Sequence, residues 1–506
     1  MKSKIVNFTG TLLIAVFLFL LGSCKKFLSE LPSKSSNIPV STIGDLDAIL
    51  ANYSSFYTEE NNMAIMATDN TGFNKNIFDV KPSVFPNVWY FYSFFGDPDL
   101  IANNTLDRLW SGEYTKIFTA NLVLNSLDKV AGGTQEKANL KAEAHLLRAY
   151  AMFVLANNFC LPYTESNKTE PGLVLKQTTS FEEPVGRATL QETYAFIEND
   201  VLEALKSTSS LIVNGKVRHW RGSKTAAAGF AARYYLQINN YTAALKYANL
   251  ALADYNILVD YNTEMKYGND GVVTVNGTPF TIKYPYTHNS SNDFDIIGWK
   301  EFLYLRTLNF SGWWFMPSQD LMNQYDQVND LRYEYHFVEG YSYDRGLNAN
   351  PSYSYPGYIF FYKSKVPSGP TTAEMYLIKA ECLVRENNTG DALTAVNMLR
   401  AKRMKPGLWV NLTAEDQAEA LAKILQERRR ELPFSHRWLD IRRLNHNGDN
   451  SDDVVISKTF YPYTTTVNTS AAPVTYVLPN NSRRYAQPIP AMELPASKGV
   501  IKQNTY

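Results

Sequence analysis

Apolar residues recur at helical spacing along much of the chain. The clearest case is Ala138–Cys160, in which one apolar stripe is formed by Leu140, Ala144, Leu147, Ala151 and Val154. Residues spaced in this way lie on one face of a helix, and Pro162 marks its end because proline cannot continue the hydrogen-bond ladder. The pattern predicts a long amphipathic helix that packs against other helices.

Further stretches show the same periodicity. The predicted helices are Ile43–Tyr53, Tyr114–Val130, Thr189–Lys206, Ser223–Gln237, Tyr241–Ala253, Ala373–Glu386 and Asp391–Lys402. Several of them alternate alanine with larger residues, as in Tyr241-x2-Ala244-x3-Ala248. Small residues at this spacing let antiparallel helices approach closely, as in a tetratricopeptide repeat (TPR). We therefore predict a mainly α fold of helical hairpins, and a TPR-like superhelix is the sharper form of this prediction.

The stretch Ile424–Arg443 combines a dense run of charges with apolar residues at helical spacing. Pro433 should split it into two helices joined by a turn. Mixed charges beside a buried stripe predict a structural ion-pair network. Its expected members are Glu427 and Glu431 with the arginines at 428–430, Asp440 with Arg437 or Arg443, and the neighbouring Trp438. A solvated charged face is the alternative. A nucleic-acid patch is disfavoured because the chain has 49 Lys+Arg and 49 Asp+Glu.

Two segments lack helical periodicity and are rich in aromatic residues. Ala67–Gly112 is predicted to be a long ordered loop, with aromatic residues Phe85, Trp89, Tyr90, Phe91, Tyr92, Phe94, Phe95 and Trp110. Tyr255–Pro370 is predicted to be a loop-rich lobe with weak strand patterns at Val272–Val275 and Tyr358–Tyr362. Long loops in compact domains are usually functional, which makes both segments candidate binding surfaces.

The first residues have the pattern of an export signal. Lys2 and Lys4 precede the apolar run Leu12–Leu21, which is shorter than the roughly 20 residues that span a bilayer. The run ends in Leu-Gly-Ser-Cys24 and resembles the bacterial lipobox, whose cysteine is diacylated. An ordinary cleavage site with an incidental cysteine is the alternative. We predict that Cys24 is lipidated and that Ser29–Val40 is a polar tether.

The composition is that of a globular protein, with 45% hydrophobic and 19% charged residues. Cys160 and Cys382 lie in apolar helical patterns, so we predict buried thiols rather than a disulfide. The sequence contains no H-E-x-x-H, G-x-S-x-G or P-loop motif, and its 6 His residues are scattered. Asp97 and Asp99 could form a carboxylate pair, but an acidic turn explains them better. We predict no enzymatic activity, no cofactor and no metal, which leaves a binding surface.

Several motifs resemble those of the SusD/RagB family. They are ERRRELPFSHRWLDIRR at 427–443, EAHLLRAYAMFVLANNFCLPY at 143–163, Pro317–Leu321 with Asp330–Arg332, and Pro488–Leu494 with Gln503–Tyr506. Pro433, Ser435-His436 and His145 depart from the family pattern. The resemblance implies a SusD-like fold and a glycan-binding lipoprotein of the outer membrane, facing the cell exterior. The implied partner is a SusC-like TonB-dependent transporter, to which captured oligosaccharide or polysaccharide is delivered. A RagB-like peptide-binding lipoprotein and a TPR-type protein-binding scaffold are the alternatives.

The same resemblance suggests how the chain is divided. We expect a lipoprotein signal peptide at 1–23 and a lipid-anchored tether at 24–40. An N-terminal SusD-like region with TPR-like hairpins should occupy 41–254. A C-terminal RagB/SusD region, with the loop-rich lobe and further TPR-like helices, should occupy 255–506.

Candidate ligand residues come from the chemistry of sugars, which present flat apolar C–H faces and hydroxyl groups. Aromatic rings and planar polar side chains bind both features. Ala67–Gly112 and Trp299–Gln324 supply this mixture, with the candidates Asp69, Asn70, Asn74, Trp89, Tyr90, Trp313, Trp314 and Gln319. No motif carries these residues over from the family. For each aromatic residue the alternative is burial in the core.

Overall fold

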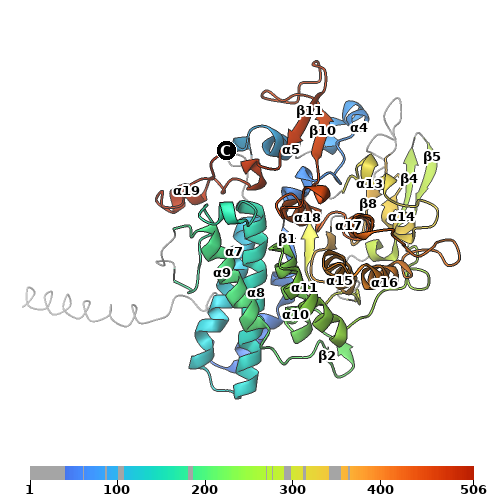
Figure 1. Ribbon diagram of the computed structural model, residues 1–506. Helices are drawn as coiled ribbons and strands as arrows, with labels where there is room; N and C mark the ends of the chain where they lie inside the picture. The colour runs from blue at the N-terminus through green and yellow to red at the C-terminus, as the bar shows by residue number, and fades with distance from the viewer. Residues whose placement is uncertain are drawn as a thin grey trace, which may run out of the picture.

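Helical hairpins build the body of the protein (Figure 1). The computed structural model describes residues 40–506 apart from 61, 86–87, 101–107, 181–185, 269–270, 276, 290–297, 311–314, 341–354 and 363–364. The predicted signal segment, Cys24 and most of the tether lie outside the described residues. The α-helices are α3 (Ile43–Ala51), α4 (Lys75–Val80), α5 (Val88–Phe95), α7 (Arg108–Ser126), α8 (Thr134–Phe159), α9 (Leu190–Ala204), α10 (Lys224–Gln237), α11 (Tyr241–Asp254), α13 (Gln319–Asn323), α14 (Leu331–His336), α15 (Thr372–Arg385), α16 (Thr389–Arg400), α17 (Gln417–Glu431), α18 (Arg437–Leu444) and α19 (Glu493–Ala496).

Two hairpins, α10–α11 and α15–α16, use the same Asn-Asn turn. Asn239 and Asn387 have φ angles of 59° and 63°, a left-handed conformation that asparagine adopts more readily than most residues. The following residues, Asn240 and Asn388, cap the second helix by accepting a hydrogen bond from a backbone N–H three positions on. The shared turn makes the two hairpins structural repeats and confirms the predicted helical hairpins.

The helices pack in series. α8 lies between α7 and α9, α11 packs on both α10 and α15, and α15 also packs on α16 and α17 (Figure 1). Ala244, Ala248 and Ala251 of α11 are fully buried, which allows the close approach that the alanine spacing predicts. The prediction of a mainly α, TPR-like fold is confirmed.

Small β-sheets join the helices to the loop-rich lobe. The strands are β1 (Thr58–Glu60), β2 (Ile212–Val213), β3 (Lys216–Val217), β4 (Gly271–Val275), β5 (Thr278–Ile282), β6 (Thr307–Asn309), β7 (Phe337–Val338), β8 (Gly357–Tyr358), β9 (Lys365–Pro367), β10 (Ile456–Phe460) and β11 (Val474–Leu478). β6 lies between β1, to which it is parallel, and β9, to which it is antiparallel. The remaining strands pair as antiparallel hairpins or ribbons. The strand predicted at Val272–Val275 is confirmed, whereas only the first residue of Tyr358–Tyr362 belongs to a strand.

The prediction that Ala67–Gly112 is one long loop is wrong, because α4, α5 and the start of α7 lie within it. Its aromatic residues are also largely core rather than an exposed platform: Phe85, Tyr90, Phe91, Tyr92, Phe94, Phe95 and Trp110 are buried. The ring of Phe91 lies 5.9 Å from that of Phe460 and 5.2 Å from that of Tyr476. A helix as apolar as α5 must be covered on most sides, and the β10–β11 hairpin supplies part of that cover.

Cys160 and Cys382 are buried free thiols, as predicted. His145 is one of the residues that depart from the motifs of the resembling family. It forms a buried hydrogen bond of 2.6 Å with Asp200 and so has a structural partner. Across the described ranges, no helix combines the length and the apolar composition that crossing a bilayer requires.

Candidate ligand-binding site

Two segments that are predicted separately, from the sequence, to bind ligand lie side by side in the structure. Gly72 N–H donates to the carbonyl of Met316 at 2.8 Å, and Ser318 N–H donates to the carbonyl of Asn70 at 2.7 Å. Thr71 and Pro317 form an antiparallel bridge between these bonds. We call Asp69–Phe73 together with Phe315–Gln319 the loop junction. The junction brings together the two halves of the predicted ligand surface, which lie about 250 residues apart in sequence.

The predicted ligand residues differ in their surroundings. Gln319 is exposed at the start of α13, where its amide donates to Asn323 at 2.9 Å. Asn74 caps α4 by accepting from Ile77 N–H, and Tyr90 is buried. Trp89 belongs to α5, but its side chain is not among the described ones, and Trp313 and Trp314 lie outside the described residues.

Asp69 is held by two arginines. Its carboxylate accepts hydrogen bonds of 2.8 and 2.7 Å from Arg437 and lies 3.1 Å from a nitrogen of Arg429. Burial raises the pKa of Asp69, but the charges of Arg437 and Arg429 outweigh burial and lower the pKa to about 2. Asp69 is therefore ionised at neutral pH, and these contacts give it a structural role in shaping the junction.

Asn70 faces the interior and is fully buried. Its amide nitrogen donates to the carbonyl of Pro433 at 2.6 Å, and its amide oxygen accepts from Arg429 at 2.7 Å. Both ends of the amide are thus occupied by groups of the protein. In this conformation Asn70 therefore has no exposed polar atom that could form the predicted hydrogen bonds with a ligand.

Lys458 lies behind the junction and is absent from the sequence predictions. Its ammonium group donates to the carbonyl of Thr71 at 2.5 Å and lies 5.5 Å from the centre of the Phe73 ring. Burial lowers the pKa of Lys458 to about 7, although the nearby Asp69 opposes this shift. A sequence clue exists, because Lys458 shares the inward phase of β10 with Ile456 and Phe460.

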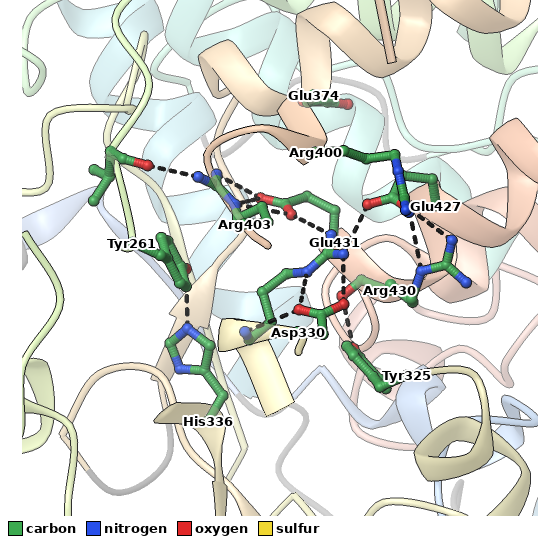
Figure 2. Close-up of polar contacts among 12 residues, drawn as sticks. Tyr261, Tyr325, Asp330, His336, Glu374, Arg400, Arg403, Glu427, Arg430 and Glu431 are labelled. Carbon is green, nitrogen blue, oxygen red and sulfur yellow. Dashed lines mark hydrogen bonds and ion pairs between the residues drawn. The ribbon is translucent and has the colours of Figure 1, made fainter. Parts of the chain in front are cut away.

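The charged stretch behind the junction forms two helices, α17 and α18, on either side of the break at Pro433, as predicted. Glu427 lies at the centre of a buried network. It pairs with Arg430 at 2.6 Å, Arg332 at 2.7 Å and Arg400 at 2.8 Å (Figure 2). Burial raises the pKa of Glu427, but these arginines lower it well below its usual value.

Glu431 has different partners from those predicted. It pairs with Arg403 and Arg332, both at 2.8 Å, and not with the arginines at 428–430 (Figure 2). Arg428 lies three positions before Glu431 on the same helix face, but it binds Asp440 instead. Here Glu431 points toward the α14 side of the network, where Asp330 also binds Arg332.

Asp440 pairs with Arg443 at 3.0 Å, one of the two partners predicted, and with Arg428 at 2.9 Å. The other predicted partner, Arg437, instead reaches Asp69. Trp438 is buried and its indole donates to the carbonyl of Asn157 at 3.1 Å. The charges of this stretch are mostly buried and paired, which contradicts the solvated-face alternative.

A separate pocket of about 510 Å³ lies between α7 and the segment 174–180. Its lining includes Trp110, Tyr114, Phe118, Val174, Lys176 and Thr178. None of these residues belongs to the junction. Mixed aromatic and polar linings suit small organic ligands in general.

The candidate carboxylate pair, Asp97 and Asp99, lies in a turn. Asp99 N–H donates to the Asp97 carboxylate at 3.0 Å, the hydrogen bond of the predicted acidic turn. Within the parts of the chain that the structure describes, His, Cys, Asp and Glu side chains form no group of three suited to hold a metal ion.

Comparison with known proteins identifies the relatives of this chain. A family model described as starch-binding and associating with the outer membrane matches residues 26–236, and the SusD family model matches residues 372–506. A SusD-like protein from Bacteroides ovatus is 24% identical over 383 residues. The match spans 67% of this chain and 65% of the length of that relative.

Solved structures share the fold. A SusD superfamily protein from Bacteroides thetaiotaomicron has a TM-score of 0.63 at 16% identity, covering 92% of this chain and 100% of the other. A SusD-like carbohydrate binding protein from Bacteroides fragilis has a TM-score of 0.58 at 15% identity, covering 91% and 98%. With family models of the SusD type matching residues 26–236 and 372–506, the chain belongs to the SusD family.

Proposed function

We propose that this protein captures a neutral oligosaccharide or polysaccharide at the cell surface and delivers it to a SusC-like TonB-dependent transporter. Membership of the SusD family supports the proposal, as does the likeness to a structure described as a carbohydrate binding protein. Delivery favours modest affinity, because a ligand that is held tightly leaves slowly.

The single observation that carries the proposal is the loop junction. Gly72 and Met316, and likewise Asn70 and Ser318, are joined by backbone hydrogen bonds. In our proposal the ligand surface comprises this junction with Gln319, Asn74 and the tryptophans at 89, 313 and 314. Aromatic rings would stack on the apolar face of a sugar while amides bind its hydroxyl groups.

The charge of the junction fits an uncharged ligand. Asp69 is neutralised by Arg437, and Arg429 binds Asp320 at 2.7 Å. Carboxylates and guanidinium groups thus balance locally, so no strong field of one sign faces solvent. A polyanion or a strongly basic peptide would gain little from such a surface.

The proposed location is the outer leaflet of the outer membrane. The lipobox-like sequence before Cys24 supports anchoring through acyl chains on that cysteine. Lipid on Cys24 and the polar tether after it would leave the folded part free to meet ligand and transporter. In this proposal the protein binds its ligand and leaves its bonds intact, since the sequence contains none of the catalytic motifs sought.

A glycan array and a peptide library, probed with the soluble chain 25–506, test the proposal. Binding to neutral oligosaccharides with no selective peptide binding is the expected result. Selective binding of peptides alone would replace it with a RagB-like function. Retention of neither class, together with capture of protein partners by the helical hairpins, would favour a TPR-type scaffold.

A further inference from the structure

Three consecutive residues of the junction are each held by a cation from the C-terminal part of the chain. Asp69 binds Arg437 in a bidentate pair. The amide oxygen of Asn70 accepts from Arg429 at 2.7 Å. The carbonyl of Thr71 accepts from Lys458 at 2.5 Å. The cations come from α17, α18 and β10, so three elements converge on one short loop.

The cations approach the loop from the protein side. The side chains of Arg437 and Arg429 are only 8% and 10% exposed, and Lys458 is buried. A group covered in this way cannot offer its charge to a ligand on the outer surface. Charge-assisted and bidentate hydrogen bonds are both strong and directional. Such bonds therefore favour one conformation of the loop.

Movement of this loop would be passed to its neighbours. A Cβ atom at Gly72 would lie 2.6 Å from the carbonyl oxygen of Pro317, so the two backbones already touch. The ring of Phe73 lies 4.5 Å from that of Phe91 in α5.

We propose that Arg429, Arg437 and Lys458 act as positioning residues that hold Asp69–Phe73, and with it the ligand surface, in its binding conformation. The inference rests on the proposed function for its link to ligand binding. The three cations are covered by the protein and act through the loop. Their role is therefore distinct from the role of the ion pairs of Glu427 and Glu431, which hold helices together.

The first test needs no ligand. Hydrogen–deuterium exchange is measured on residues 67–74 in the full mature chain for Arg437→Gln, Asp69→Asn and Lys458→Met. We expect each variant to exchange in this segment about tenfold faster than wild type, since each loses or weakens the hydrogen bonds that fix the loop. Arg437→Lys keeps the charge and should restore part of the protection.

Arg443→Gln is the matched control. Arg443 is a buried arginine of the same motif, but it binds Glu381 at 2.6 and 2.7 Å and does not reach the junction. Its loss should lower the melting temperature while exchange in residues 67–74 stays at the wild-type rate. Equal exchange in this segment for Arg437→Gln, Asp69→Asn and wild type would overturn the inference even if Arg437→Gln melts early.

The second test uses the oligosaccharide that wild type binds most tightly on the glycan array. Below the melting temperature of each variant, Asp69→Asn and Arg437→Gln should bind this oligosaccharide about tenfold more weakly, and Arg443→Gln should bind it normally. Faster exchange with unchanged affinity would refute the positioning role. If wild type binds no oligosaccharide, the proposed function fails, and the exchange result alone decides whether the cations hold the loop.

Discussion

Arg437 and Asp69 stand 368 positions apart in the sequence and meet in a bidentate ion pair with hydrogen bonds of 2.8 and 2.7 Å. Arg437 belongs to the charged motif by which the chain resembles its family, and Asp69 belongs to the loop junction. The pair thus connects the most recognisable stretch of the sequence to the proposed ligand surface.

The Asp69–Arg437 pair should make stability depend on pH. The pKa of Asp69 is lowered from 3.8 to about 2 in the folded protein. A lowered carboxyl pKa stabilises the fold above about pH 4, and this contribution is lost as pH falls toward 2. Urea unfolding should show Asp69→Asn less stable by about 2–3 kcal/mol at pH 7, with the difference shrinking toward pH 2. A difference that does not change with pH would contradict the pairing.

The buried network should be costly to break. Glu431→Ala leaves Arg403 and Arg332 with fewer partners in the protein interior, so we expect a loss of about 3–5 kcal/mol in the free energy of unfolding. Chemical denaturation measures this loss. Glu415→Gln, at an exposed site just before α17, is the control and should unfold like wild type. A Glu431→Ala protein as stable as the control would show that the network contributes little.

Local features of the fold could be predicted from the sequence. The helices around α8 and the break at Pro433 follow from periodicity and from proline chemistry, which act between neighbouring residues. The partner of Arg437 could not be predicted, because an ion pair across hundreds of positions leaves no periodic pattern. Composition alone was misleading for α5, because Tyr90–Tyr92, Phe94 and Phe95 are predicted to form an exposed platform and are buried in the core. Lys458 could have been noticed as a charge in the inward phase of a strand.

Lys458 should make stability rise with pH in a second, more alkaline window. Burial lowers its pKa from 10.5 to about 7, so between these values the unfolded chain binds more protons than the folded one. Stability should therefore rise with pH in this window, by up to about 1.4 kcal/mol per pH unit. Urea unfolding at pH 7, 8 and 9 should show a steeper rise for wild type than for Lys458→Met. Parallel curves would mean that Lys458 keeps its ordinary pKa.

The proposed lipidation of Cys24 can be tested by labelling. Fatty-acid labelling of the protein should disappear in Cys24→Ala, and this variant should move from the membrane fraction to the soluble fraction. Cys160→Ala, which removes a buried thiol, is the control and should stay labelled. Membrane anchorage that persists in Cys24→Ala would refute lipidation at this residue.

Tryptophan variants locate the rings that stack on the sugar. Trp89→Ala or Trp313→Ala should weaken binding of the array-selected oligosaccharide by about 1–3 kcal/mol, the scale of burying a large apolar side chain. Both variants should keep the wild-type melting temperature. Trp409→Ala, at a half-buried site over which Arg400 lies at 5.5 Å, is the control. Normal binding by both variants would indicate that the ligand binds at Trp314 or in the pocket beside Tyr114. Unfolding of both variants would indicate that these rings belong to the core.

Isothermal titration calorimetry of the mature chain 25–506 with the array-selected neutral oligosaccharide tests the central claim most directly. The same samples are assayed for reducing ends after titration. We predict saturable binding of modest affinity and no release of reducing ends. The absence of binding to any oligosaccharide would contradict glycan capture, and the appearance of reducing ends would contradict a purely binding role.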